Sequence, residues 1–150
     1  ENFFILLAVR QGWKVSASSQ DENIKEHWDY LIEKDEQQYK VEVKSKKRIS
    51  RSDASEQNNF IWVELQNVRG NTGWLFGKAD LIAFEKEKTF LFIKKPDLLK
   101  TVNKKVNLVA KVKSPQDAVY KIYKREGRKD KLTLLPMQDI EEIKFMEWEK

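Results

Sequence analysis

Two short segments of alternating polar and apolar residues constrain the fold of this 150-residue chain more than any other feature. They are residues 28–33 (WDYLIE) and 39–44 (YKVEVK), separated by the wholly polar residues 34–38. A period of two is typical of a β-strand with one buried face. The pattern therefore predicts a hairpin with Trp28, Tyr30, Ile32, Tyr39, Val41 and Val43 facing inward, and Asp29, Leu31, Glu33, Lys40, Glu42 and Lys44 on the opposite face.

The rest of the chain predicts more strands and a few helices. Residues 3–11 form an expected helix that stops at Gly12, a brief strand lies within 15–19, and residues 21–23 form an acidic turn. Further strands are expected at 60–66, 79–84, 89–93, 106–112, 119–124 and 131–135, with helices at 96–102 and 137–147. This order indicates one α+β domain over residues 1–150, with a mixed, mostly antiparallel sheet flanked by helices.

The composition narrows the chemistry that the chain can support. There is no Cys and a single His, His27, which excludes disulfides, Cys-based sites and His-rich zinc sites. Metal chemistry would have to rest on carboxylates, which favour Mg²⁺, Mn²⁺ or Ca²⁺. There is no run of 18 apolar residues and no signal-peptide pattern, so we expect neither a membrane span nor secretion.

The polar face of the first hairpin carries the residues that could do chemistry. Glu42 and Lys44 are two positions apart on one strand and so point to the same side of the sheet. If the loop is centred near Glu36, Asp29 lies across from Glu42, with Cβ atoms about 4.5–5.5 Å apart. Two carboxylates at that spacing can share a hard cation, and Lys44 would stand beside them. Hydrolysis of a phosphodiester needs this combination of metal and cation.

The Glu-x-Lys pattern is weak by itself in a chain that is 35% charged. A second copy occurs at residues 142–144, but there it lies in the predicted helix, where positions two apart do not share a face. The copy at 42–44 lies in a predicted strand, between two valines, with an Asp one hairpin upstream. The competing interpretation of Asp29, Glu42 and Lys44 is a solvated strand face with a cross-strand ion pair.

These residues resemble a known family. An Asp at the start of one strand followed by Glu-Val-Lys on the next is similar to the PD-(D/E)XK nuclease superfamily, which includes restriction endonucleases, Holliday-junction resolvases and many phage-encoded nucleases. The stretch EHWDYLI…YKVEVKSKKR carries most of the likeness, which covers roughly residues 1–94 and is strongest over 27–48. The later stretch WVELQNVRGNTGWLFGKADLIAF is similar to uncharacterised phage members. Trp28 stands where the family name has Pro, which many members also lack.

The resemblance implies a restriction-endonuclease-like core and a Mg²⁺-dependent deoxyribonuclease, expected to act as an endonuclease, with Mn²⁺ able to substitute. Asp29, Glu42 and the backbone carbonyl of Val43 would bind the metal, and Lys44 would lie next to the attacking water. DNA is then the expected partner, in the cytoplasm of a bacterium, an archaeon or a phage-infected host. Family habit also suggests a homodimer.

Several other residues are candidates for binding. The net charge of +5 leans towards a polyanion, and a basic run that follows the active strand favours phosphate contact; it consists of Lys46, Lys47, Arg48 and Arg51. Weaker candidates, each with an ordinary structural role as the alternative, are Glu1, His27, Glu64, Gln66, Lys78, Asp80 and, for base stacking, Trp62 and Trp74.

Two functions from other classes compete with the nuclease. One is a nucleic-acid-binding module on a nuclease-like fold that no longer cuts, although the complete Asp29, Glu42 and Lys44 set argues against a degraded site. The other is a structural or assembly protein in which that set is a coincidence. Cleavage assays with and without a chelator separate all three functions.

Overall fold

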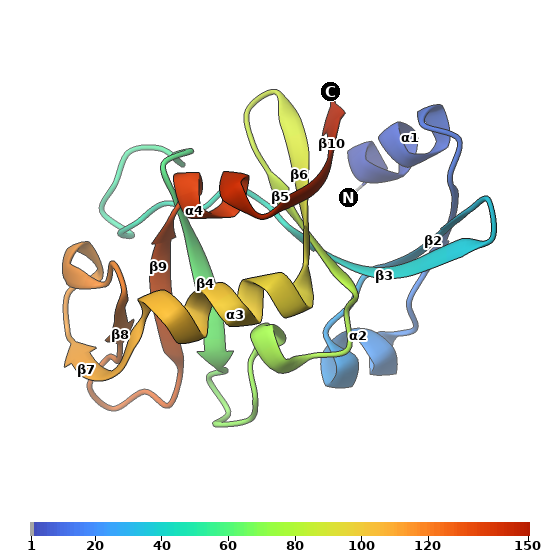
Figure 1. Ribbon diagram of the computed structural model, residues 1–150. Coiled ribbons are helices and arrows are strands. Elements are labelled where there is room, and N and C mark those ends of the chain that lie inside the picture. Colours follow the sequence, from blue (N-terminus) through green and yellow to red (C-terminus); the bar gives the residue numbers. More distant parts are fainter. Residues whose placement is uncertain (1) are drawn as a thin grey trace. The chain divides into compact units, whose positions relative to one another are not determined.

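The computed structural model describes residues 2–150, and the contacts of the chain divide it into two compact units. The first unit comprises residues up to Ser45, Gly77–Lys95 and Lys144–Lys150. The second comprises Lys46–Phe76 and Pro96–Ile143. Each unit is built around its own β-sheet (Figure 1). The α+β class predicted from the sequence is confirmed.

The first unit contains a six-stranded mixed sheet with the order β1-β2-β3-β5-β6-β10. Strand β3 pairs with β5 in parallel, and all the other neighbours are antiparallel, so the predicted mixed and mostly antiparallel sheet is confirmed. The strands are β1 (Lys14–Ala17), β2 (Tyr30–Lys34), β3 (Gln37–Lys44), β5 (Leu81–Glu85), β6 (Thr89–Lys94) and β10 (Lys144–Glu149).

The β2–β3 hairpin forms as the alternation predicted. Tyr30 pairs with Val41 and Ile32 with Tyr39, and the predicted inward-facing residues of β2 are buried. The loop is tighter than expected, because only two residues lie between the strands. Both of them, Asp35 and Glu36, have left-handed backbones with φ of 51° and 66°. Two such residues make the hairpin turn whose twist matches that of the flanking strands.

Helix α1 (Asn2–Arg10) covers this sheet through one apolar face, and Gly12 with φ of 88° ends it as predicted. Phe4 and Leu7 of the helix are fully buried in a core of aromatic and aliphatic side chains. Phe4 lies 5.3 Å from the rings of both Tyr30 and Trp148, measured between centroids. The helix and the edge strand β10 are therefore held by one aromatic cluster.

The second unit contains a four-stranded sheet with the order β4-β9-β8-β7. Its strands are β4 (Phe60–Gln66), β7 (Asn107–Val112), β8 (Lys121–Tyr123) and β9 (Lys131–Pro136). The helical elements are α3 (Lys95–Lys105), whose first residue belongs to the first unit, α4 (Met137–Glu142), and the short turns η1 (Trp74–Phe76) and η2 (Pro115–Asp117). Each predicted strand of this region is present, and α3 runs three residues beyond the predicted Val102.

Two expectations about local structure are wrong. The expected acidic turn at 21–23 is a helix, α2 (Gln20–Glu26), which begins at a capping box formed by Ser19 and Glu22. The expected helix at 137–147 ends at Glu142, and β10 follows it. Pairing with β6 and burial of Trp148 against Phe92, 4.4 Å away, outweigh the helical spacing in that segment.

Among the described residues, no helix combines the length and the apolar character needed to cross a membrane.

Candidate active site

Strand β3 carries two of the three predicted site residues near its end. Glu42 is buried, with 7% of its surface exposed, because β3 is an interior strand with β2 on one side and β5 on the other. Its Oε1 lies 3.0 Å from Nζ of the half-buried Lys44. This contact confirms that the two side chains share one face. A carboxylate is rarely this buried without a cation beside it.

Asp29 lies just before β2, where the main chain of the hairpin leaves the ladder. Its backbone N–H donates to the carbonyl of Val41 at 2.8 Å. Two positions further along β3, beyond the last residue pair of the β2–β3 ladder, the N–H of Val43 donates to Oδ2 of Asp29 at 2.7 Å. The carboxylate thus replaces a strand carbonyl that the sheet would otherwise need. This places Asp29 at the residue that separates Glu42 from Lys44.

Helix α2 holds the other oxygen of Asp29. The side chain of Asn23 donates from Nδ2 to Oδ1 of Asp29 at 2.7 Å and to the carbonyl of Trp28 at 3.2 Å. Asn23 lies in the helix that sequence reasoning missed, so its contact with the site was missed as well. The signal that could have found it is Ser19-x-x-Glu22, a capping box that predicts a helix start.

The end of α2 is held by close contact with residues 77–78, which precede β5. His27 caps the helix with a left-handed backbone (φ 58°), and the N–H of Lys78 donates to the carbonyl of Glu26 at 2.7 Å. A Cβ placed on Gly77 would lie 2.7 Å from both that carbonyl oxygen and the Cβ of His27. Gly77 is therefore required for the approach. His27 is half-buried there, and its predicted contact with a phosphate stays a prediction.

The three predicted residues are linked through the main chain of β3. Sequence reasoning treated Asp29 and Glu42 as neighbouring like charges. In the structure each carboxylate has its own compensation: Asp29 accepts two hydrogen bonds, and Glu42 is paired with Lys44. The site is consequently formed before any ligand binds.

The donor set fits a hard divalent cation. Asp29 and Glu42 supply carboxylate oxygens and Val43 a backbone carbonyl, and Mg²⁺ is commonly bound through only one or two carboxylates. Within residues 2–150, no group of three or more His, Cys, Asp or Glu side chains is arranged to hold a metal. Any metal here would therefore keep much of its coordination shell for water or substrate. The predicted role of Glu1 falls outside the described residues.

Asp80 has a structural role immediately before β5. Its Oδ2 accepts from the backbone N–H of Lys40 at 2.8 Å, and its own N–H donates to the carbonyl of Lys40 at 2.8 Å. Its charge also acts on Lys95, whose pKa is lowered by burial, an effect that Asp80 opposes. These contacts explain Asp80 without a second acidic site.

The predicted basic run lies in the second unit and is partly engaged. Lys47, Arg48 and Arg51 are exposed and Lys46 is half-buried. Nη1 of Arg48 donates to the carbonyls of Arg51 at 3.1 Å and Asp53 at 3.3 Å, so this guanidinium closes a loop. Lys47 and Arg51 remain directed to solvent, which favours them over Arg48 as phosphate contacts.

Three of the weaker candidates, Trp62, Glu64 and Gln66, lie on strand β4. Trp62 donates from Nε1 to the carbonyl of Arg48 at 3.1 Å and packs on Tyr123, 5.5 Å between ring centroids. Gln66 donates from Nε2 to the carbonyl of Lys129 at 2.6 Å. Trp74 is buried in the core of its unit. Trp62 and Gln66 thus anchor loops, whereas Glu64 stays half-buried between them; a bulge between Glu64 and Gln66 breaks the alternation that predicted a shared face for these two residues.

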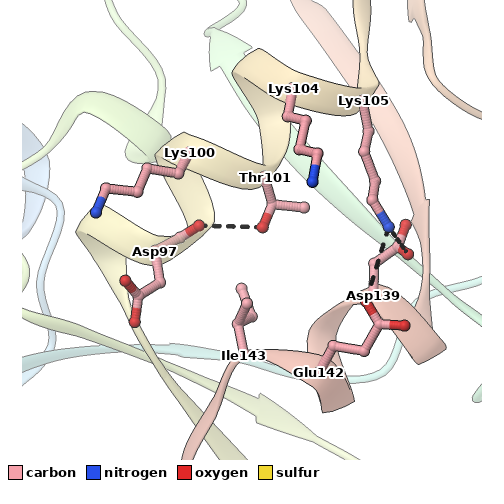
Figure 2. A pocket seen from close by; sticks show the side chains of 8 residues that line it. All are labelled: Asp97, Lys100, Thr101, Lys104, Lys105, Asp139, Glu142 and Ile143. Atoms are coloured by element: carbon pink, nitrogen blue, oxygen red, sulfur yellow. Dashed lines mark hydrogen bonds and ion pairs between the residues drawn. The ribbon is translucent and has the colours of Figure 1, made fainter.

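A pocket of about 220 Å³ lies between α3 and α4 in the second unit (Figure 2). Asp139, 6% exposed, accepts hydrogen bonds of 2.5 Å from Lys105 Nζ and from the Tyr120 hydroxyl. The hydrogen bond to Asp139 raises the pKa of Lys105 and also that of Tyr120. The pocket lining balances three lysines with three carboxylates. Lys105 also lies 3.8 Å from Glu142, so the network ties α3, α4 and the segment before β8 together.

Comparisons with known proteins give one distant likeness. No protein-family model and no curated protein matches the chain. Among solved structures, the bacterial homing endonuclease I-Ssp6803I is similar, at 21% sequence identity and a TM-score of 0.43. The match covers 65% of this chain and 62% of that one. The chain thus spans less than two thirds of the length of that endonuclease, and so low a score assigns neither a family nor an activity.

Proposed function

We propose that this protein is a metal-dependent deoxyribonuclease that hydrolyses phosphodiester bonds, with Asp29, Glu42 and Lys44 as its active site. One observation carries the proposal. The buried Glu42, paired with the half-buried Lys44, and a prepositioned aspartate lie around one residue of an interior strand, Val43. A solvated strand face, the competing interpretation, would leave such charges exposed. Buried and oriented charge is typical of functional sites.

The residues of the proposed active site would have three separate roles: binding the metal, orienting Asp29 and stabilising negative charge. Asp29, Glu42 and the carbonyl of Val43 would hold a Mg²⁺ ion, which when bound would activate water and screen the phosphate charge. Asn23 and the N–H of Val43 orient the Asp29 carboxylate before substrate arrives. Lys44 presents a positive charge on the Glu42 side and would orient the nucleophile or stabilise negative charge that develops on the phosphate oxygens.

The substrate class follows from charge and from the sequence resemblance. The chain carries a net charge of +5, which attracts a polyanion. The PD-(D/E)XK likeness of residues 27–48 suggests DNA, a double strand or a junction, and a homodimer with Mn²⁺ as an alternative metal. The competing function is a module on the same fold that binds nucleic acid without cutting it.

Cleavage of supercoiled plasmid and of branched and linear oligonucleotides, with Mg²⁺ or with EDTA, tests the proposal. Glu42→Gln keeps the shape of the side chain and removes its charge, so cleavage should disappear. The second Glu-x-Lys copy provides the matched control: Glu142→Gln with Lys144→Ala should cut like wild type. Binding without cleavage in the wild type, in Mg²⁺ and in Mn²⁺, would establish the binding module instead.

A further inference from the structure

The positive charge of the chain is concentrated in one of its two units. Counted from the sequence, the second unit has 16 Lys and Arg against 10 Asp and Glu, a net charge of +6. The first unit has 13 against 14, a net charge of −1. The candidate active site therefore lies in a nearly neutral unit. A polyanionic substrate would have to be attracted mainly by the other one.

A second basic segment of the second unit is the loop between β8 and β9, residues 124–130 (KREGRKD). It was not singled out by the sequence analysis. Strands β4 and β9 are antiparallel, so this loop and the loop that follows β4 leave the sheet at the same end (Figure 1). They also approach closely, because a Cβ placed on Gly70 would lie 3.1 Å from Cδ of Lys129.

Both acidic residues of the β8–β9 loop form ion pairs, whereas several basic residues of the two loops stay exposed. Nη2 of Arg125 donates to Oδ2 of Asp130 at 2.6 Å, and Asp130 is only 4% exposed. Glu126 lies 4.0 Å from Nζ of Lys113. Across residues 2–150, by contrast, no carboxylate forms an ion pair with three exposed side chains of the two loops, those of Arg69, Arg128 and Lys129.

The loops are held in place by main-chain contacts. Gln66 fixes the β8–β9 loop at the carbonyl of Lys129, and Oδ1 of Asn67 accepts from the N–H groups of Arg69 and Asn71 at 3.0 Å each. Fixed loops lose less conformational entropy on binding than flexible ones. A cluster of unpaired cations on fixed loops is a suitable surface for a phosphate backbone.

Strand β4 connects this cluster to the basic run at 46–51. Trp62 anchors the run at the carbonyl of Arg48, and Gln66 anchors the β8–β9 loop. These residues are four positions apart on one strand, about 13 Å at roughly 3.3 Å per residue. That span corresponds to about four nucleotide steps of a strand with a 3.4 Å rise.

We propose that Arg69, Arg128 and Lys129 form a second nucleic-acid-binding surface, which contacts the phosphate backbone of DNA together with the 46–51 run. DNA as the polyanion rests on the proposed function; the surface itself rests on the loop geometry. Phosphate contacts carry no sequence information, so this surface contributes affinity and register rather than specificity.

The test measures binding of the whole chain to a fluorescent duplex in EDTA, where no cleavage is expected, over a series of salt concentrations. Arg69→Gln, Arg128→Gln and Lys129→Gln together should weaken binding at least tenfold. They should also reduce the slope of log affinity against log salt by about 2–3, at roughly 0.9 per lost phosphate contact. The matched control, Lys14→Gln, Lys25→Gln and Lys88→Gln, removes the same charge from the first unit and should change the slope by less than one contact.

The outcomes are distinct from those of the cleavage assay. An unchanged slope in the loop variant, or an equal loss in the control, overturns the proposal. Binding to phosphatidylserine vesicles but not to DNA would also overturn it, in favour of a membrane surface. Salt-sensitive binding that depends on the three residues, in a wild type that never cuts, would support the surface while refuting the nuclease. Arg128→Gln alone, next to the open turn at Gly127, serves if the triple variant unfolds, and should reduce the slope by about one.

Discussion

Asp29 has two roles to separate, because its carboxylate is both a candidate ligand and a structural acceptor. Oδ2 satisfies the N–H of Val43, and an unsatisfied buried N–H costs about 1–3 kcal/mol. An alanine variant would lose both roles at once and would prove nothing about catalysis. Asparagine keeps an acceptor for Val43 and removes only the charge.

We predict that Asp29→Asn abolishes cleavage and Mn²⁺ binding while retaining the fold. Placing the amide oxygen on Val43 turns the new NH₂ towards the NH₂ of Asn23, so a small loss of stability is expected. The double variant Asn23→Asp with Asp29→Asn restores the donor-acceptor match and the net charge but moves the carboxylate to α2. It should stay inactive, and it should melt below wild type because a carboxylate at position 23 cannot donate to the carbonyl of Trp28. Activity in the double variant would show that the position of the charge is unimportant.

Lys44 also needs a variant that separates its roles. We predict that Lys44→Ala reduces turnover at least a hundredfold with little change in DNA affinity, because the side chain would act on charge formed in the transition state. It should also lower stability, since buried Glu42 loses its cation. Lys44→Arg keeps the charge and should restore the melting temperature without restoring turnover. If Lys44→Arg restored turnover together with the melting temperature, the role of Lys44 would be purely structural.

At this scale the sequence predicted which residues meet but not how they are compensated. Alternation over 39–44 was enough to place Glu42 and Lys44 on one face. The hydrogen bonds of Asp29 depend on the main chain leaving the ladder before Tyr30, a detail that no periodic pattern encodes. The burial of Glu42 depends on the pairing of β3 with β5, and in the sequence the whole of β4 lies between these two strands.

Among the elements, hairpins were predictable and contacts of short helices were not. The β2–β3 hairpin follows from local alternation, and the β5–β6 hairpin from two apolar runs on either side of a charged turn. Helix α2, in contrast, has no buried residue and thus no apolar period to detect. Its function is to carry Asn23 to Asp29. A helix of this length in isolation is unstable in water, so its cap and its contacts maintain it.

We predict that weakening α2 impairs the site without changing DNA affinity. Ser19→Ala removes the capping hydrogen bond to Glu22, 3.1 Å long, and should cost about 1 kcal/mol. Asn23→Ala removes the donor to Asp29 directly and should lower the turnover number more than Ser19→Ala does. Turnover at saturating DNA measures both losses, and DNA affinity in EDTA is the control. A turnover number in Asn23→Ala no lower than that in Ser19→Ala would mean that the Asn23 contact with Asp29 does not support catalysis.

A second prediction at the scale of elements concerns the network at Asp139. Tyr120→Phe removes a hydrogen bond to a buried carboxylate and should cost about 1 kcal/mol in unfolding free energy. The folded-state pKa of Tyr120 is raised, so its contribution is fully present below the unfolded pKa of about 10 and is lost as pH rises through the folded pKa. The difference between wild type and variant, from urea unfolding, should stay constant near neutral pH and shrink in alkali. A difference that grew with pH would contradict this account.

For the whole molecule, the α+β class and the strands could be predicted from the sequence, but the division of the strands between two sheets could not. Strand β4 follows β3 in the chain, yet it joins the second sheet, and β3 pairs in parallel with β5 instead. Sequence periodicity identifies strands and does not identify partners that lie tens of residues apart. The unequal charge of the two units becomes visible only when this division is known.

The division leads to a last prediction about how the basic segments combine. The 46–51 run and the Arg69, Arg128 and Lys129 surface are held at different residues of β4 and share no side-chain contact among the described residues. Effects at separate sites usually add. Neutralising Lys46, Lys47 and Arg48 should therefore flatten the salt dependence of DNA binding by a fixed amount, with Arg48 contributing least because it bonds two carbonyls.

Combining those substitutions with the three in the loops should lower the salt slope by the sum of the two separate decreases. Turnover at saturating DNA should stay near that of wild type, because neither set belongs to the proposed active site. The measurement is a salt titration of binding in EDTA, followed by cleavage in Mg²⁺ at low salt, for the two triple variants and their combination. A combined decrease no larger than that of one set would mean that the two segments compete for the same phosphates. They would then not lie along one DNA backbone.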